Sequence, residues 1–69
     1  MESIGQFVKR KRKENNLRQE ELALYAGVSI KFLIDLEKDK KTLRIDKVND
    51  VLKVFNYTLG PLLLGNTNE

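Results

Sequence analysis

The sequence predicts a small all-α domain of four to five compactly packed helices. Apolar residues recur at three- and four-residue spacings along most of the chain, which is the pattern of helices with one buried face. Gly and Asn, which commonly end helices, fall between these periodic segments. With 69 residues and no cysteine, the chain has a small core and no disulfide to stabilise it. We therefore expect a homodimer.

The first helix is predicted over residues 4–14. Ser3 followed by Gln6 has the form of a capping box, and the apolar residues behind it keep the helical spacing. Asn15 is expected to end the helix. The same apolar stripe reaches Arg12, so one charged residue falls on the buried side and needs a partner.

The second helix is predicted over residues 19–26. Glu20 and Glu21 lie in its first turn, where carboxylates suit the positive end of the helix dipole. Gly27 is expected to take the left-handed conformation that ends this helix. Ser29 is then placed to cap the next helix.

The third helix, predicted over residues 30–38, is expected to carry an acid on its inward side. On a wheel at about 100° per residue, the inward side is formed by Ile30, Leu33, Leu36 and Glu37. The outward side is formed by Lys31, Asp35 and Lys38, with Phe32 and Ile34 on the flanks. A buried carboxylate is costly unless it is paired, so we predict an ion pair between Glu37 and Arg12. The alternative is that both charges reach solvent.

The fourth helix has the clearest amphipathic pattern. Its apolar residues are Ile45, Val48, Val51, Leu52 and Phe55. Thr42 is predicted to cap it, and Asn56 is predicted to end it in the left-handed conformation. These four helices make a predicted domain of residues 1–56.

Residues 57–69 differ in composition from the helices. They are strand-like but contain the breaker Gly60-Pro61, and we expect an extended tail that serves dimerisation or docks a partner. The predicted dimerisation residues are Tyr57, Leu59, Leu62 and Leu63. The alternative is a fifth short helix packed on the same chain. Residues 65–69 are expected to be disordered.

The charge distribution favours a polyanionic partner over catalysis. The net charge is +3, and basic residues cluster in 9–13 and 31–41, which suits nucleic acid, although a charge run can also be a solvated face. The chain has neither His nor Cys, which disfavours an enzyme and leaves no implied metal or cofactor. No signal peptide is apparent, and the longest apolar run, 62–64, is far too short to span a membrane. We expect a cytoplasmic, nucleoid-associated protein.

The segment from Leu17 to Glu37 resembles the helix-turn-helix of the lambda-repressor-like (XRE) regulators. The residues that carry the resemblance are Leu17, Gln19, Glu21, Leu22, Ala23, Gly27, Val28, Ser29, Leu33, Leu36 and Glu37. The resemblance extends over about residues 4–56 and implies binding of double-stranded operator DNA. It also implies a buried ion pair like that predicted between Arg12 and Glu37.

The resemblance assigns DNA contacts to individual positions. Gln19 would anchor a phosphate and brace the third helix, and Arg18, at the usual position of a Thr or Ser cap, would reach a phosphate. The positions facing base edges are Ser29, Ile30, Lys31 and Asp35, flanked by Phe32, Ile34 and Lys38. Phosphate contacts are implied for Lys38, Lys40 and Lys41. Lys31 suits guanine, Asp35 suits cytosine and Ile30 suits a thymine methyl group.

Within this family, the segment Thr42–Val48 is similar to small HipB-type antitoxins. That similarity implies a two-fold dimer that represses its own operon and binds a HipA-like kinase toxin. Two alternatives remain. One is a free-standing phage-type or metabolic repressor, and the other is a four-helix adaptor that binds only protein.

Overall fold

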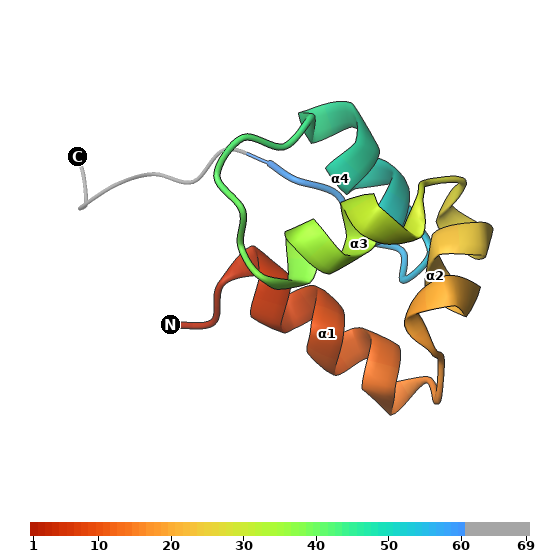
Figure 1. Ribbon diagram of the computed structural model, residues 1–69. Coiled ribbons are helices and arrows are strands. Elements are labelled where there is room, and N and C mark those ends of the chain that lie inside the picture. Colours follow the sequence, from red (N-terminus) through yellow and green to blue (C-terminus); the bar gives the residue numbers. More distant parts are fainter. Residues whose placement is uncertain (61–69) are drawn as a thin grey trace.

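The computed structural model describes residues 1–60 as four helices without a β-strand. The helices are α1 (Ile4–Glu14), α2 (Gln19–Ala26), α3 (Ile30–Glu37) and α4 (Ile45–Lys53). Figure 1 shows α3 in front of α4, with α1 running below it and α2 at one end. The predicted all-α class is confirmed. No helix within these 60 residues has the length and apolar character needed to cross a membrane.

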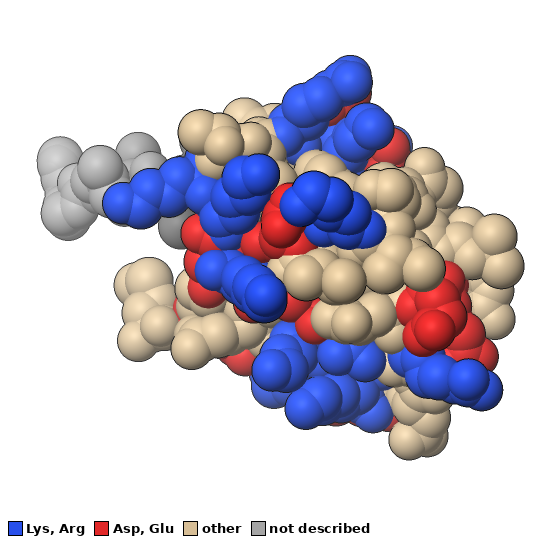
Figure 2. Space-filling model, in the orientation of Figure 1, with Lys and Arg blue, Asp and Glu red and all other residues tan. Residues whose placement is uncertain are grey.

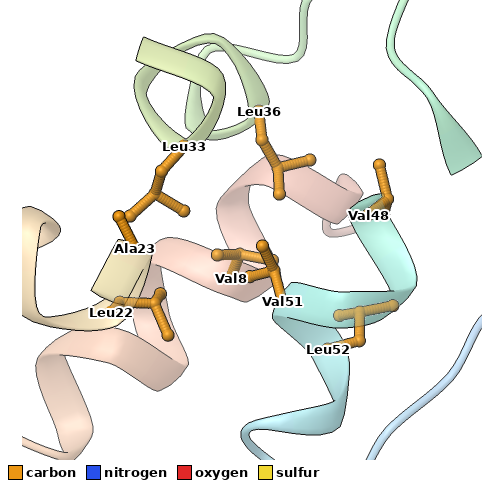
Figure 3. Close-up of a cluster of buried hydrophobic side chains, with 8 residues drawn as sticks. All are labelled: Val8, Leu22, Ala23, Leu33, Leu36, Val48, Val51 and Leu52. Atoms are coloured by element: carbon orange, nitrogen blue, oxygen red, sulfur yellow. The ribbon is translucent and has the colours of Figure 1, made fainter. Parts of the chain in front are cut away.

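All four helices contribute side chains to one apolar core. The core residues are Val8 from α1, Leu22 and Ala23 from α2, Leu33 and Leu36 from α3, and Val48, Val51 and Leu52 from α4 (Figure 3). Because α3 places two leucines in this core, its opposite side is left on the surface.

The beginning of α1 is fixed by a capping box and by a distant acid. Ser3 Oγ accepts a hydrogen bond from the Gln6 backbone N–H, and the Gln6 side chain accepts one from the Ser3 N–H. Asp39, which follows α3, accepts from Gly5 N at 2.8 Å and from Ser3 Oγ at 2.6 Å. A Cβ atom on Gly5 would clash with the carbonyl oxygen of Leu36 and with the Asp39 carboxylate. Glycine at this position therefore allows α1 and α3 to approach closely.

Two isoleucines predicted to face inward are exposed. Ile30 is 46 % exposed and Ile45 is 66 % exposed. Each is the first residue of its helix, and helical side chains lean toward the N-terminus. Both side chains therefore project past the end of the core.

The predicted start of α4 is also wrong. The N-cap residue is Arg44 instead of Thr42, and Arg44 forms no side-chain cap. Its guanidinium pairs with Asp46 in the first turn, at 2.7 Å. The helix itself ends at Lys53, and a tighter turn continues to Asn56, which has φ = 66° as predicted.

The segment after α4 runs back over its own chain without forming a helix up to residue 60. Asn49 Oδ1 accepts hydrogen bonds from Leu59 N at 2.7 Å and from Thr58 Oγ1 at 3.1 Å. The Tyr57 ring packs edge-on against Phe7, with ring centres 4.9 Å apart. The predictions for Leu62, Leu63 and the disordered end lie outside the described residues, and the predicted domain boundary after residue 56 stays a prediction.

Candidate nucleic-acid interface

A glycine turn sets the position of α3 relative to α2. Gly27 has φ = 73°, a left-handed conformation that suits glycine. The next N–H, from Val28, donates to Ala23 O at 3.0 Å. Ser29 then caps α3, because its Oγ accepts from Phe32 N at 3.0 Å. The connection is thus short, and hydrogen bonds close the end of α2 and the beginning of α3.

A buried ion pair holds α3 against the rest of the domain. Arg12 Nε donates to Glu37 Oε2 at 2.7 Å, and Arg12 Nη2 donates to Glu37 Oε1 at 3.1 Å. These side chains are only 10 % and 4 % exposed. Gln19 also donates to Glu37 Oε1, at 3.2 Å, and Arg12 Nη1 donates to Leu17 O at 2.8 Å. This network joins α1, α2 and α3, and we call it the Arg12–Gln19–Glu37 network.

The outward side of α3 carries a lysine and an acid that interact with each other. Lys31 Nζ lies 3.4 Å from Asp35 Oδ2, and its side chain is 81 % exposed. Lys40 Nζ lies 3.6 Å from the same oxygen. Two lysines therefore compensate the Asp35 carboxylate, which would otherwise repel a phosphate backbone. The contacts are long and the Lys31 ammonium stays free to reach a base edge, whereas Asp35 is only 21 % exposed and lies beside the two lysines.

The apolar residues near this side divide into two groups. Ile30 is exposed at the start of α3, beside the exposed Ser29. Phe32 and Ile34 are partly buried, and Phe32 packs against the core. Phe32 was predicted to lie on the surface beside the base-facing residues, but it is largely withdrawn from that surface. The reason is that the flank of α3 that carries Phe32 borders the core.

Positive charge surrounds α3. In the orientation of Figure 2, lysine and arginine side chains gather beside and below α3, and acidic side chains lie over α2 and between the basic ones beside α3. Lys38, Lys40 and Lys41 are exposed at the end of α3 and in the loop that follows. Arg18 is exposed at the start of α2, where its N–H donates to Glu21 Oε1 at 2.7 Å. The Glu21 carboxylate thus satisfies the Arg18 N–H, but no side chain at the N-cap accepts from the first turn of α2 as a Thr or Ser would. The Arg18 guanidinium stays on the surface.

Asp39 is a positioning residue that was not predicted from the sequence. It has φ = 59° and bonds to the beginning of α1. The three lysines of the neighbouring loop are thereby attached to the domain. Helical periodicity gives no signal for such a contact, because it joins residues more than thirty positions apart. The one hint in the sequence is a glycine inside the first helix, which indicates a close approach.

The helix α3 is capped and exposed, and it follows a glycine turn. It is held from behind by the Arg12–Gln19–Glu37 network and is bordered by lysines. These features define a helix-turn-helix DNA-binding domain. Comparison with known proteins gives the same class. A family described as helix-turn-helix matches residues 8–62. An uncharacterized HTH-type transcriptional regulator, y4mF of Sinorhizobium fredii (strain NBRC 101917 / NGR234), is 47 % identical over 66 residues. These cover 96 % of this chain and 87 % of the relative.

The comparison with solved structures found no significant match to the chain. The family match covers most of the sequence, and the chain belongs to the lambda-repressor-like (XRE) helix-turn-helix family. The predicted family is confirmed. Its members are DNA-binding transcriptional regulators, a class distinct from enzymes.

Proposed function

We propose that the protein is a dimeric, sequence-specific repressor that inserts α3 into the major groove of each operator half-site. The observation that carries this proposal is the outward side of α3, where Lys31 and Asp35 are presented by a helix that the Arg12–Gln19–Glu37 network holds from behind. In such dimers the two helices are about 34 Å apart, one turn of DNA.

The exposed groups suit particular contacts. Lys31 can donate to guanine O6 and N7, Asp35 can accept from cytosine N4, and Ile30 can touch a thymine methyl group. Ser29 completes the base-facing set, and the partly buried Ile34 flanks it. The proposed phosphate contacts are Arg18, Gln19, Lys38, Lys40 and Lys41. Gln19 keeps a second amide hydrogen for this purpose, because its bond to Glu37 uses only one.

The base-reading assignment can be tested with operator DNA selected from a pool of random duplexes. The double substitution Lys31→Ala with Asp35→Ala should weaken binding to the selected duplex by about 1–3 kcal/mol. Binding to a mixed-sequence duplex should change much less. Lys53→Ala, which removes an exposed lysine from the last turn of α4, serves as the control. If affinity and footprint of the double variant match the wild type, α3 does not read the bases.

The second copy is proposed to pack on the C-terminal segment. Tyr57 and Leu59 are exposed, and together with Ile4 and Phe7 they line a shallow, mainly apolar hollow. Exposed apolar side chains gathered in one place are typical of an interaction surface. Leu62 and Leu63 come shortly after Leu59 in the sequence. They are proposed to extend this contact.

We further propose that this repressor is the antitoxin of a HipBA-like module with a HipA-like kinase toxin as partner. The support is the similarity of residues 42–48 to HipB-type antitoxins. The test is affinity purification of the full chain from its native host. Recovery of a stoichiometric kinase-like protein encoded beside it is expected. Recovery of the chain with operator DNA but without such a protein would favour the free-standing repressor, and recovery of protein partners without DNA binding would favour the adaptor.

A further inference from the structure

The basic run from Lys9 to Lys13 does not act as one charged surface. Arg10 bonds to Glu2 at 2.8 Å and to Glu14 at 2.9 Å. Lys11 lies 3.6 Å from Glu14. The remaining arginine of the run is the buried partner in the Arg12–Gln19–Glu37 network. Three of the five positive charges are therefore balanced by carboxylates of the same chain.

Two lysines of the run are left over. Within residues 1–60, neither Lys9 nor Lys13 has an acidic partner within salt-bridge distance, and both are exposed. Lys11, in contrast, is turned toward the C-terminal segment, because its ammonium lies 5.4 Å from the centre of the Tyr57 ring. The positive charge available on α1 is thus concentrated at two positions one turn apart.

Lys9 lies near the edge of α1 that borders α3, and Lys13 lies one turn further along α1 and further around it. Gly5 marks the side of α1 that touches α3, since a Cβ there would meet Leu36 O. Lys9 and Lys13 follow at intervals of four residues, and each step of four turns about 40° around the helix. Lys9 therefore lies about 40° and Lys13 about 80° from Gly5, so Lys9 is the nearer of the two to the α3 side. The two lysines line a shallow hollow on the exposed side of α1 together with Gln6 and the paired Arg10 and Glu14. Figure 2 shows lysine and arginine side chains over α1 on the same face as α3.

We propose that Lys9 and Lys13 bind phosphates of the DNA on the α1 side of α3. This inference rests on the proposed DNA binding and adds two contacts to the phosphate set around the reading helix. An unpaired ammonium can approach a phosphate without first breaking an ion pair, whereas Arg10 and Lys11 must break one. The nearness of Lys9 to α3, with Lys13 one turn further along α1, makes a duplex already held by α3 the occupant that fits.

The test is the salt dependence of binding to a labelled mixed-sequence duplex of about 20 base pairs, two helical turns. Each phosphate contact contributes about 0.9 to the slope of log affinity against log salt. Lys9→Ala with Lys13→Ala should lower that slope by about 1.8 and weaken binding to selected and mixed sequences by the same factor. Lys53→Ala removes one charge elsewhere and should leave the slope nearly unchanged. Lys9→Arg with Lys13→Arg should keep the wild-type slope.

Two other results would overturn the inference, and the wild-type slope distinguishes them. If the wild type binds DNA with a steep slope and the double alanine variant has the same slope, the inference fails and the proposed function stands. If the wild type shows no salt-dependent DNA binding, the proposed function fails as well. Lys9→Gln with Lys13→Gln gives a second measurement if the alanine variant melts early. A slope restored by glutamine would show that charge at these positions is not used.

Discussion

Removal of the buried Glu37 carboxylate should strongly destabilise the domain. Glu37 accepts two hydrogen bonds from Arg12 and one from Gln19. In Glu37→Ala, the Arg12 guanidinium would stay buried with only the Leu17 carbonyl as a partner. Breaking one side of a buried ion pair typically costs about 3–5 kcal/mol. We expect a loss in that range, because both side chains are almost completely shielded from water.

That loss is comparable with the whole stability of a chain this small. Native domains are stable by about 0.05–0.15 kcal/mol per residue, or roughly 3–10 kcal/mol for a chain of this length. Urea unfolding followed by circular dichroism should therefore show Glu37→Ala partly unfolded without denaturant. Glu37→Gln keeps the shape and one acceptor, and should lie between the alanine variant and the wild type.

The control removes both charges together. Arg12→Met with Glu37→Leu replaces the ion pair by apolar groups of similar size, and such replacements are commonly neutral or stabilising. We expect this double variant to fold with near wild-type stability. If Glu37→Ala lowers the free energy of unfolding by less than about 1 kcal/mol, the surface value for an ion pair, then the two charges are solvated and the reasoning is wrong.

Three further predictions concern other parts of the molecule. Gly5→Ala should lower the melting temperature, because the added Cβ meets Leu36 O and Asp39. Alanine inside a helix is normally favoured over glycine by about 0.5–1 kcal/mol. An unchanged or higher melting temperature would therefore contradict the close approach of α1 and α3. Hydrogen bonds from Arg10 hold the pKa of Glu2 and of Glu14 below the ordinary value of 4.5. Their stabilising effect should be complete above that value and be lost as the pH falls through the lowered pKa values, because the unfolded state then binds more protons. Urea midpoints measured on acidification should show this loss, and Arg10→Gln should reduce it. Finally, truncation after Asn56 should weaken self-association in sedimentation experiments, and a truncated chain that dimerises like the full chain would exclude the C-terminal segment from the interface.

The helix bounds and the turn were predictable because they depend on neighbours in the sequence. The bounds of α1 and α2 agree with the predicted ranges, and α3 ends one residue earlier than predicted. Gly27 and Ser29 have the predicted conformations. A helical wheel also brings Glu37 to the inward side, where it meets Arg12. Each of these features follows from spacing within one turn of a helix or from the chemistry of a single residue.

The features that were missed depend on contacts between distant segments or on the ends of helices. The wheel gives the direction of a side chain around the axis but not whether the core extends as far as the first residue, and this is why Ile30 and Ile45 were placed inward. Asp39 at the start of α1 and Asn49 under the C-terminal segment are acceptors for backbone groups far along the sequence. Polar residues of this kind have no periodic signal, so only the packed structure shows their partners.

The groups that hold α3 and the groups proposed to read DNA are different residues, and this separation has a consequence for the family. Leu33, Leu36 and Glu37 face the interior, whereas Lys31 projects almost entirely into solvent. Exchange of Lys31 should therefore change the preferred base sequence with little effect on stability, since surface substitutions usually change it by less than about 0.5 kcal/mol. Membership of the helix-turn-helix family depends on the interior set, which many regulators can share. Under the proposed base-reading assignment the operator depends on the outward set, so a relative with 47 % identity that differs there is expected to keep the scaffold and recognise a different sequence.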